Sequence, residues 1–126
     1  TAAISSGVSY YVEHLFDEQG LPRPFSKAPR LTVYKQELYD YAECFNLCGL
    51  LLGRFQSLDD RLRSALANLL DQWQKPDGSF RTRRLRFGWD NVPMHRWAQS
   101  QLFRALCLLI PQSDCRGGIV AADSDA

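Results

Sequence analysis

The sequence predicts an all-α protein built from two helical hairpins over residues 1–112, followed by a disordered tail over residues 113–126. Three observations lead to this prediction. Apolar residues recur at helical spacing in four segments, and no segment shows the alternation of a half-buried strand. The two halves of the chain also align with each other, which is typical of repeat architectures.

The first hairpin is expected to pair a helix over Ser6–Asp17 with a longer helix over Gln36–Phe55. The first helix ends near Gly20, a residue that commonly terminates helices. Its apolar face consists of Val8, Tyr11, Val12, Leu15 and Phe16. In the longer helix, Tyr41, Phe45, Cys48 and Leu52 follow one another at steps of four, three and four.

The second hairpin is expected to begin at Ser57, because a serine followed three residues later by Asp60 resembles a capping box. The helix that follows has its apolar face at Leu58, Leu62, Ala65, Leu66, Leu69, Leu70 and Trp73. A last helix is predicted from about Pro93, a favourable first-turn residue, as far as Pro111.

Comparison of the two halves predicts two repeats, over about residues 6–56 and 57–111. At an offset of 56 positions Tyr41 aligns with Trp97, and at 58 positions Gly20 aligns with Gly78. Each half is therefore predicted to contain a helix, a glycine turn, a long basic connection and a second helix. The alternative is that any two amphipathic helices align passably.

Composition argues against several classes of protein. The chain has 15 Lys and Arg against 14 Asp and Glu, so it has no overall charge bias toward nucleic acid. Its longest apolar run, around Ala105–Ile110, is far shorter than the ~20 residues that span a bilayer. The four cysteines form no disulfide-rich pattern, which predicts reduced thiols and a cytoplasmic protein. The chain starts at Thr1 without methionine, so we expect it to be processed or cut from a longer protein.

The segment "LLDQWQKPDGSF", which ends at Phe80, resembles the glutamine-and-tryptophan repeat of squalene-hopene cyclases and the matching turn of protein prenyltransferase β subunits. The segment "GLPRPFSKAPRLTVYKQELYDYAECFNLCGLL" looks like a group of bacterial toroid-like proteins associated with surface polysaccharide production. The resemblance implies a partial α/α toroid. Two hairpins are too few to close such a ring, so it also implies the remainder of a larger toroid, or a homo-oligomer.

The chemical signatures of those families are absent. Only Asp59 and Asp60 stand where a cyclase would carry its protonating aspartates, and they lie at an expected helix start. Prenyltransferases bind zinc through a cysteine two residues after the aspartate that Asp90 matches, and this chain has none there. We therefore predict no metal and no cofactor.

The basic connections are the first candidate site. Arg83, Arg84 and Arg86 lie before the last predicted helix, and basic residues also occur in the first connection. Because helix N-termini attract anions and arginine binds them in bidentate fashion, these three arginines predict a site for a phosphate or uronate group. The alternative is a solvated loop whose charges pair with nearby acids.

The starts of the second and fourth helices supply the second candidate site. Asp40, Asp90 and His95 are the acid–base candidates. The remaining candidates for ligand binding are Tyr39, Tyr41, Trp89, Arg96 and Trp97. Their mixture of polar and aromatic groups favours a glycan or phosphorylated small molecule over a purely apolar substrate. The alternative is that the aromatics are core and the charges form ordinary surface pairs.

Two functions therefore stay open. The first is a segment of a toroid enzyme that resembles terpenoid cyclases and prenyltransferases and binds an anionic isoprenoid or sugar-linked substrate. The second is a non-catalytic helical-repeat scaffold that binds polysaccharide or protein during surface-polymer assembly.

Overall fold

The computed structural model describes the chain except for residues 28, 30, 93–94 and 111–126. The predicted helix start at Pro93 and the predicted tail lie outside the described residues. The elements are, in order, α1 (Ala2–His14), β1 (Tyr34–Glu37), α2 (Leu38–Leu50), α3 (Gln56–Asn68), the π-helical turn η1 (Leu69–Trp73), β2 (Arg83–Leu85), β3 (Trp89–Asp90), the π-helical turn η2 (His95–Gln99) and α4 (Ser100–Leu109).

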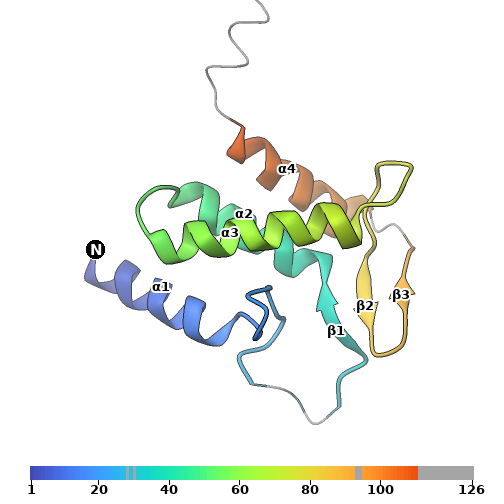
Figure 1. Ribbon diagram of the computed structural model, residues 1–126, viewed down its shortest axis with the longest axis horizontal. Helices are drawn as coiled ribbons and strands as arrows, with labels where there is room; N and C mark the ends of the chain where they lie inside the picture. Colours follow the sequence, from blue (N-terminus) through green and yellow to red (C-terminus); the bar gives the residue numbers. More distant parts are fainter. Residues whose placement is uncertain (28, 30, 93–94, 111–126) are drawn as a thin grey trace, which may run out of the picture.

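The prediction of an all-α fold is wrong, because the two long connections pair with each other as a three-stranded antiparallel sheet. Figure 1 shows β1 leading directly into α2, with β2 and β3 beside it as a hairpin. Tyr34 stands opposite Leu85, Glu37 opposite Arg83, and Arg83 opposite Asp90. The protein is therefore a mixed domain in which helices pack beside a small sheet.

The sheet changes where the helices begin. α2 starts at Leu38 because Gln36 and Glu37 belong to β1. α1 runs over Ala2–His14, earlier than predicted. The N-cap of α3 is Phe55 and not Ser57, since the backbone of Phe55 is extended and its ring packs against the core.

The hydrophobic core is centred on α2, which packs against α4 on one side and α3 on the other. Close approach to α4 occurs at Gly49, where an added Cβ would lie 3.4 Å from Cδ2 of Leu109. On the other side, the Tyr41 hydroxyl donates to Oδ1 of Asn68 in α3 at 2.6 Å. Both sides of α2 are thus fixed by specific contacts.

Trp73, the last residue of η1, joins the helices to the sheet. Its side chain is fully buried, and its ring lies 4.9 Å from that of Tyr41 in α2 and 5.0 Å from that of Trp89 in β3. The contact with Trp89 is nearly perpendicular, an arrangement that aromatic pairs favour. The tryptophan of the turn motif is therefore a packing residue.

The turns after α1 and after η1 have the same backbone structure. Gly20 and Gly78 both have a positive φ, of 78° and 86°, which glycine adopts without a steric penalty. Three backbone hydrogen bonds of the first turn recur 58 positions later. In the first turn, Asp17 N donates to Leu21 O, Gly20 N to Asp17 O, and Arg23 N to Leu15 O. The equivalent bonds of the second turn run from Lys75 N to Ser79 O, from Gly78 N to Lys75 O, and from Arg81 N to Trp73 O. This match favours the predicted repeat, although the equivalence of the whole hairpins stays a prediction.

We expect Trp73→Ala to lower the free energy of unfolding by about 3–5 kcal/mol, because it removes a fully buried indole between two rings. Urea denaturation followed by circular dichroism measures this. Leu70→Ala is the matched control on the exposed side of the same turn, and we expect it to cost less than about 1 kcal/mol. Equal losses for the two variants would contradict the packing role of Trp73.

Candidate functional site

A hollow of about 900 Å³ lies where the first turn and the first connection meet the sheet. Residues from six parts of the chain line it, namely the end of α1, the turn, the connection, β1 and single arginines from α3 and β2. The side chains that matter below are Asp17, Arg23, Phe25, Tyr34, Lys35, Gln36, Arg61 and Arg84. Its volume falls within the range of small-molecule sites.

Strand pairing brings Arg84 to this hollow. Arg84 in β2 stands opposite Gln36 in β1, and both residues line the hollow. Successive residues of a strand point to opposite faces, so Arg84 lies on the other face of the sheet from Arg83. A residue of the second connection thus contributes to a site built mainly from the first.

Two arginines at the hollow rest on aromatic rings. The Arg61 guanidinium lies 5.2 Å from the ring centre of Phe16, and that of Arg84 lies 5.7 Å from the ring centre of Trp89. Within the part of the chain that the structure describes, neither guanidinium forms an ion pair with a carboxylate. Cation–π contact therefore positions both groups while leaving their N–H donors available.

Gln36 is a buried polar residue in the wall of the hollow, with only 5% of its surface exposed. Its Nε2 donates to the carbonyl of Pro22 at 3.2 Å and to Oδ2 of Asp17 at 3.5 Å. Because both partners are acceptors, the amide orientation is fixed. Its Oε1 is then left buried without a donor, which is costly for a native structure.

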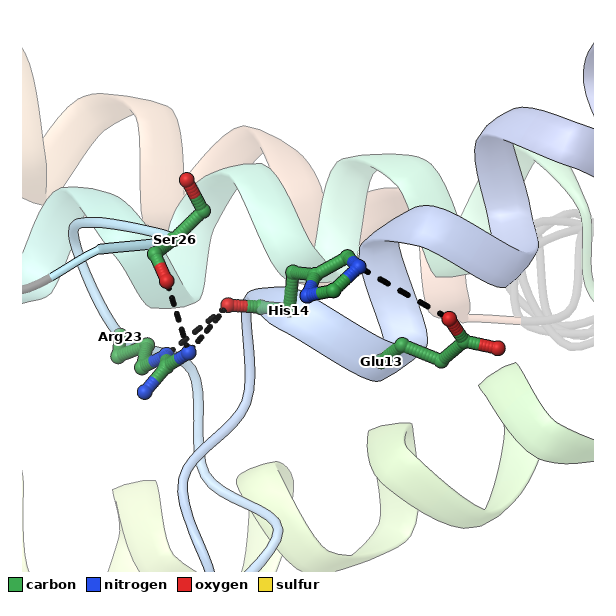
Figure 2. Close-up of polar contacts among 4 residues, drawn as sticks. All are labelled: Glu13, His14, Arg23 and Ser26. Atoms are coloured by element: carbon green, nitrogen blue, oxygen red, sulfur yellow. Dashed lines mark hydrogen bonds and ion pairs between the residues drawn. The ribbon is translucent and has the colours of Figure 1, made fainter.

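Arg23 has a structural role, which Figure 2 shows in detail. Its guanidinium donates from Nε and Nη2 to the carbonyl of His14 at the end of α1, at 2.9 and 2.8 Å, and from Nη2 to the carbonyl of Ser26 at 3.1 Å. Arg81 makes the equivalent contact in the second turn, from Nε to the carbonyl of Gln72. Arg23 therefore holds the turn to α1.

Of the three arginines predicted to bind an anion, only Arg84 lines the hollow. Arg83 donates from Nε and Nη2 to Oε1 of Glu37, at 3.0 and 2.9 Å, so its charge is already paired. Arg86 is exposed near the turn between β2 and β3, where it lies over the ring of Phe87. The sheet thus separates the predicted cluster into three different environments.

The predicted acid–base residues are not brought together in the hollow. Oδ2 of Asp40 accepts a hydrogen bond from Glu37 N at 3.0 Å, and Oδ1 of Asp90 accepts one from Val92 N at 3.1 Å. Both carboxylates therefore cap local backbone. The side chain of His95 lies outside what the structure describes.

The environment of Asp40 is nevertheless unusual. Burial raises the pKa of its carboxyl to about 6, and the nearby charge of Glu37 acts in the same direction. The hydrogen bond from Glu37 N opposes this rise without cancelling it. Asp40 is therefore the described carboxyl best suited to hold a proton near neutral pH.

The predicted aromatic ligands are divided between core and surface. Tyr41 is fully buried. Trp89 is half-buried, and its ring contacts Trp73 and the guanidinium groups of Arg81 and Arg84. Tyr39 and Trp97 are exposed, on α2 and η2 respectively, and neither lines the hollow. The side chain of Arg96 lies outside the described residues.

Arg61 and Gln36 were not identified from the sequence. Arg61 lies in an ordinary amphipathic helix, and only its place beside Leu62 on the inward side could have singled it out. No sequence signal marks Gln36, because its burial results from pairing with a segment far away in the chain. Both residues can therefore be assigned to the hollow only from the folded structure.

Among the described residues, no three His, Cys, Asp or Glu side chains gather as metal ligands. None of the described helices is long and apolar enough to cross a membrane. No family model matches the chain, and neither a curated protein nor a solved structure matches it significantly.

The raised pKa of Asp40 predicts how stability depends on pH. The carboxyl is easier to protonate in the folded state than at its ordinary pKa of 3.8, so it favours folding at low pH, and this contribution is lost as the pH rises through about 6. The difference between 3.8 and about 6 corresponds to at most about 3 kcal/mol.

Asp40→Asn should therefore gain stability relative to the wild type between about pH 4 and about pH 7. Urea denaturation of both proteins across this range measures the difference. Parallel pH profiles would show that the carboxyl titrates normally in the folded state.

Proposed function

We propose that this chain is a ligand-binding module of a helical-repeat protein, and that it binds an anionic sugar-linked molecule in the hollow beside β1. The observation that carries the proposal is the placement of Arg61 and Arg84 on aromatic rings at one hollow, without carboxylate partners among the described residues.

The anionic part of the ligand follows from these two cations. They come from α3 and β2 and line the same hollow, where Lys35 adds a third positive charge. A guanidinium donates two parallel hydrogen bonds to a carboxylate or phosphate, and such charge-assisted bonds are stronger than neutral ones. Phosphate and uronate groups both meet this requirement.

The sugar part follows from the other walls. The rings of Phe25 and Tyr34 lie 6.4 Å apart and both line the hollow, so they offer flat apolar surface to a sugar ring. An isoprenoid chain would find little matching surface, because charged side chains surround these two rings.

Binding without catalysis is favoured over an enzymatic role at this hollow. Asp40 and Asp90 are engaged in capping hydrogen bonds, and neither lines the hollow. The acids that do line it are Glu13, Asp17 and Glu18. The oxygens of Asp17 accept from the amides of Gln19 and Leu21 and from Gln36, and Glu13 lies 3.8 Å from Nε2 of His14. The scaffold alternative therefore has the stronger physical support.

A catalytic segment stays the second candidate because of Asp40. A carboxyl with a pKa of about 6 is suited to general acid–base chemistry near neutral pH. In that case the rest of a larger toroid would supply the substrate pocket. Loss of turnover in Asp40→Asn with unchanged ligand affinity would favour this candidate over the first.

The proposal also assigns the chain to the cytoplasm and to a larger assembly. The thiols of Cys44 and Cys48 are free and 4.0 Å apart, which is consistent with a reducing compartment. Apolar side chains left exposed on α4, such as Phe103, are consistent with further packing partners.

Isothermal titration calorimetry tests the ligand site with a uronic acid oligomer, a sugar phosphate and an isoprenyl diphosphate, and with a neutral oligosaccharide as the reference. We expect Arg84→Ala and Arg61→Ala each to weaken binding of the anionic sugars by about 10-fold or more. Affinity should also fall with added salt, because exposed charges are screened.

Arg63→Ala is the matched control for this experiment, since Arg63 is exposed on the same helix as Arg61 and does not line the hollow. We expect wild-type affinity in this variant. Absence of binding for every anionic probe, or equal affinities in the wild type, Arg61→Ala and Arg84→Ala, would refute the site.

A further inference from the structure

We propose that copies of this chain associate head to tail, with α1 of one copy packed on η2 and α4 of the next. This inference goes beyond the ligand site and depends on different residues. Figure 1 shows α1 and α4 on opposite sides of α2 and α3, so both surfaces can be used at once.

α3 covers one face of α2. Tyr41 and Cys48 on this face are fully buried. The hydroxyl of Tyr41 donates to Asn68 of α3, and Sγ of Cys48 donates to the carbonyl of Leu58 at 3.7 Å. α3 thus covers α2 at both of these positions.

η2 and α4 have a face equivalent to the one that α3 covers on α2. At the offset of 56 positions, Tyr41 and Cys48 correspond to Trp97 and Arg104. Trp97 is 66% exposed and Arg104 is also exposed, since no described helix covers η2 and α4 as α3 covers α2. The face that α3 covers on α2 is therefore open on η2 and α4.

α1 is the counterpart of α3 in the sequence alignment of the two halves. At the offset of 58 positions, Asn68, Leu62 and Ala65 of α3 correspond to Tyr10, Ile4 and Gly7 of α1. Tyr10 is 53% exposed, Ile4 is 43% exposed, and a Cβ placed on Gly7 would meet no atom within 4 Å. The face that α3 buries is therefore largely open on α1.

These two open faces can pack against each other in the same arrangement as α3 on α2. The contact of Tyr41 with Asn68 becomes a contact of Trp97 with Tyr10, which places two exposed aromatic rings together. Gly7 lets a neighbouring helix approach closely, as Gly49 does between α2 and α4. A second copy is therefore the occupant that the chain's own packing specifies.

The contact joins two different surfaces, so it is heterologous and leaves one free α1 and one free α4 at the ends of every open chain of copies. This property separates the proposal from a symmetric dimer. In a symmetric dimer the same surface would serve both partners, and a second contact would not form.

Sedimentation velocity measures the association. We expect the mass of the wild type to rise over roughly a hundredfold range of concentration. Tyr10→Glu blocks only the α1 surface and Trp97→Glu only the α4 surface, so each variant alone should sediment as a monomer. An equimolar mixture of the two should form a species of two chains and nothing larger, because the unchanged α4 of one variant meets the unchanged α1 of the other.

Leu31→Glu is the control, since Leu31 is 93% exposed and lies on neither surface. It should associate like the wild type. Circular dichroism checks that each variant is folded. If either glutamate variant is unfolded, Tyr10→Ala and Trp97→Ala are used in place of the two glutamate variants. A monomeric wild type at every concentration, a variant that still associates alone, or a mixture that stays monomeric would overturn the proposal.

Discussion

The pairing of β1 with β2 is the contact on which the arrangement of this protein depends. The two strands come from connections separated by a whole helical hairpin, and Arg83 in one reaches Glu37 in the other across 46 positions of sequence. The first residue of α2 is also tied to the second connection, because Leu38 N donates to the carbonyl of Thr82 at 2.9 Å. Without this pairing, Arg84 would have no fixed relation to Gln36 or to the first turn.

The alternation of side chains along β2 explains why neighbouring arginines have different roles. Arg83 points toward Glu37 and closes a partly exposed ion pair, which is worth at most about 1 kcal/mol. Arg84 points to the other face, onto Trp89, and keeps its charge free of carboxylates among the described residues. A basic segment that looks uniform in sequence is therefore divided into a structural residue and a candidate ligand-binding residue.

The helices could be predicted from sequence because their apolar spacing is a local property. Most of the stripe from Leu58 to Trp73 is buried as its period indicates, whereas Leu70, predicted to belong to it, is 53% exposed. The glycine turns share hydrogen bonds at the predicted offset. The strands could not be predicted, since "YKQE" and "RRL" are short, polar and stabilised by partners far away in the chain. Arg84 could be identified as a candidate because it belongs to a basic segment. Gln36 and Arg61 could not, because only the folded chain brings them to the hollow. Tyr41 illustrates the converse error, because a helix-start tyrosine that looked available for ligand is sealed by α3.

Nuclear Overhauser spectroscopy of the isotopically labelled protein shows whether the two connections form one sheet. This pairing predicts cross-strand contacts between Tyr34 and Leu85 and between Glu37 and Arg83, together with slow exchange of the amide protons of Leu38 and Thr82. Fast exchange of these two amides, with no contact between residues 34–37 and 83–85, would contradict it.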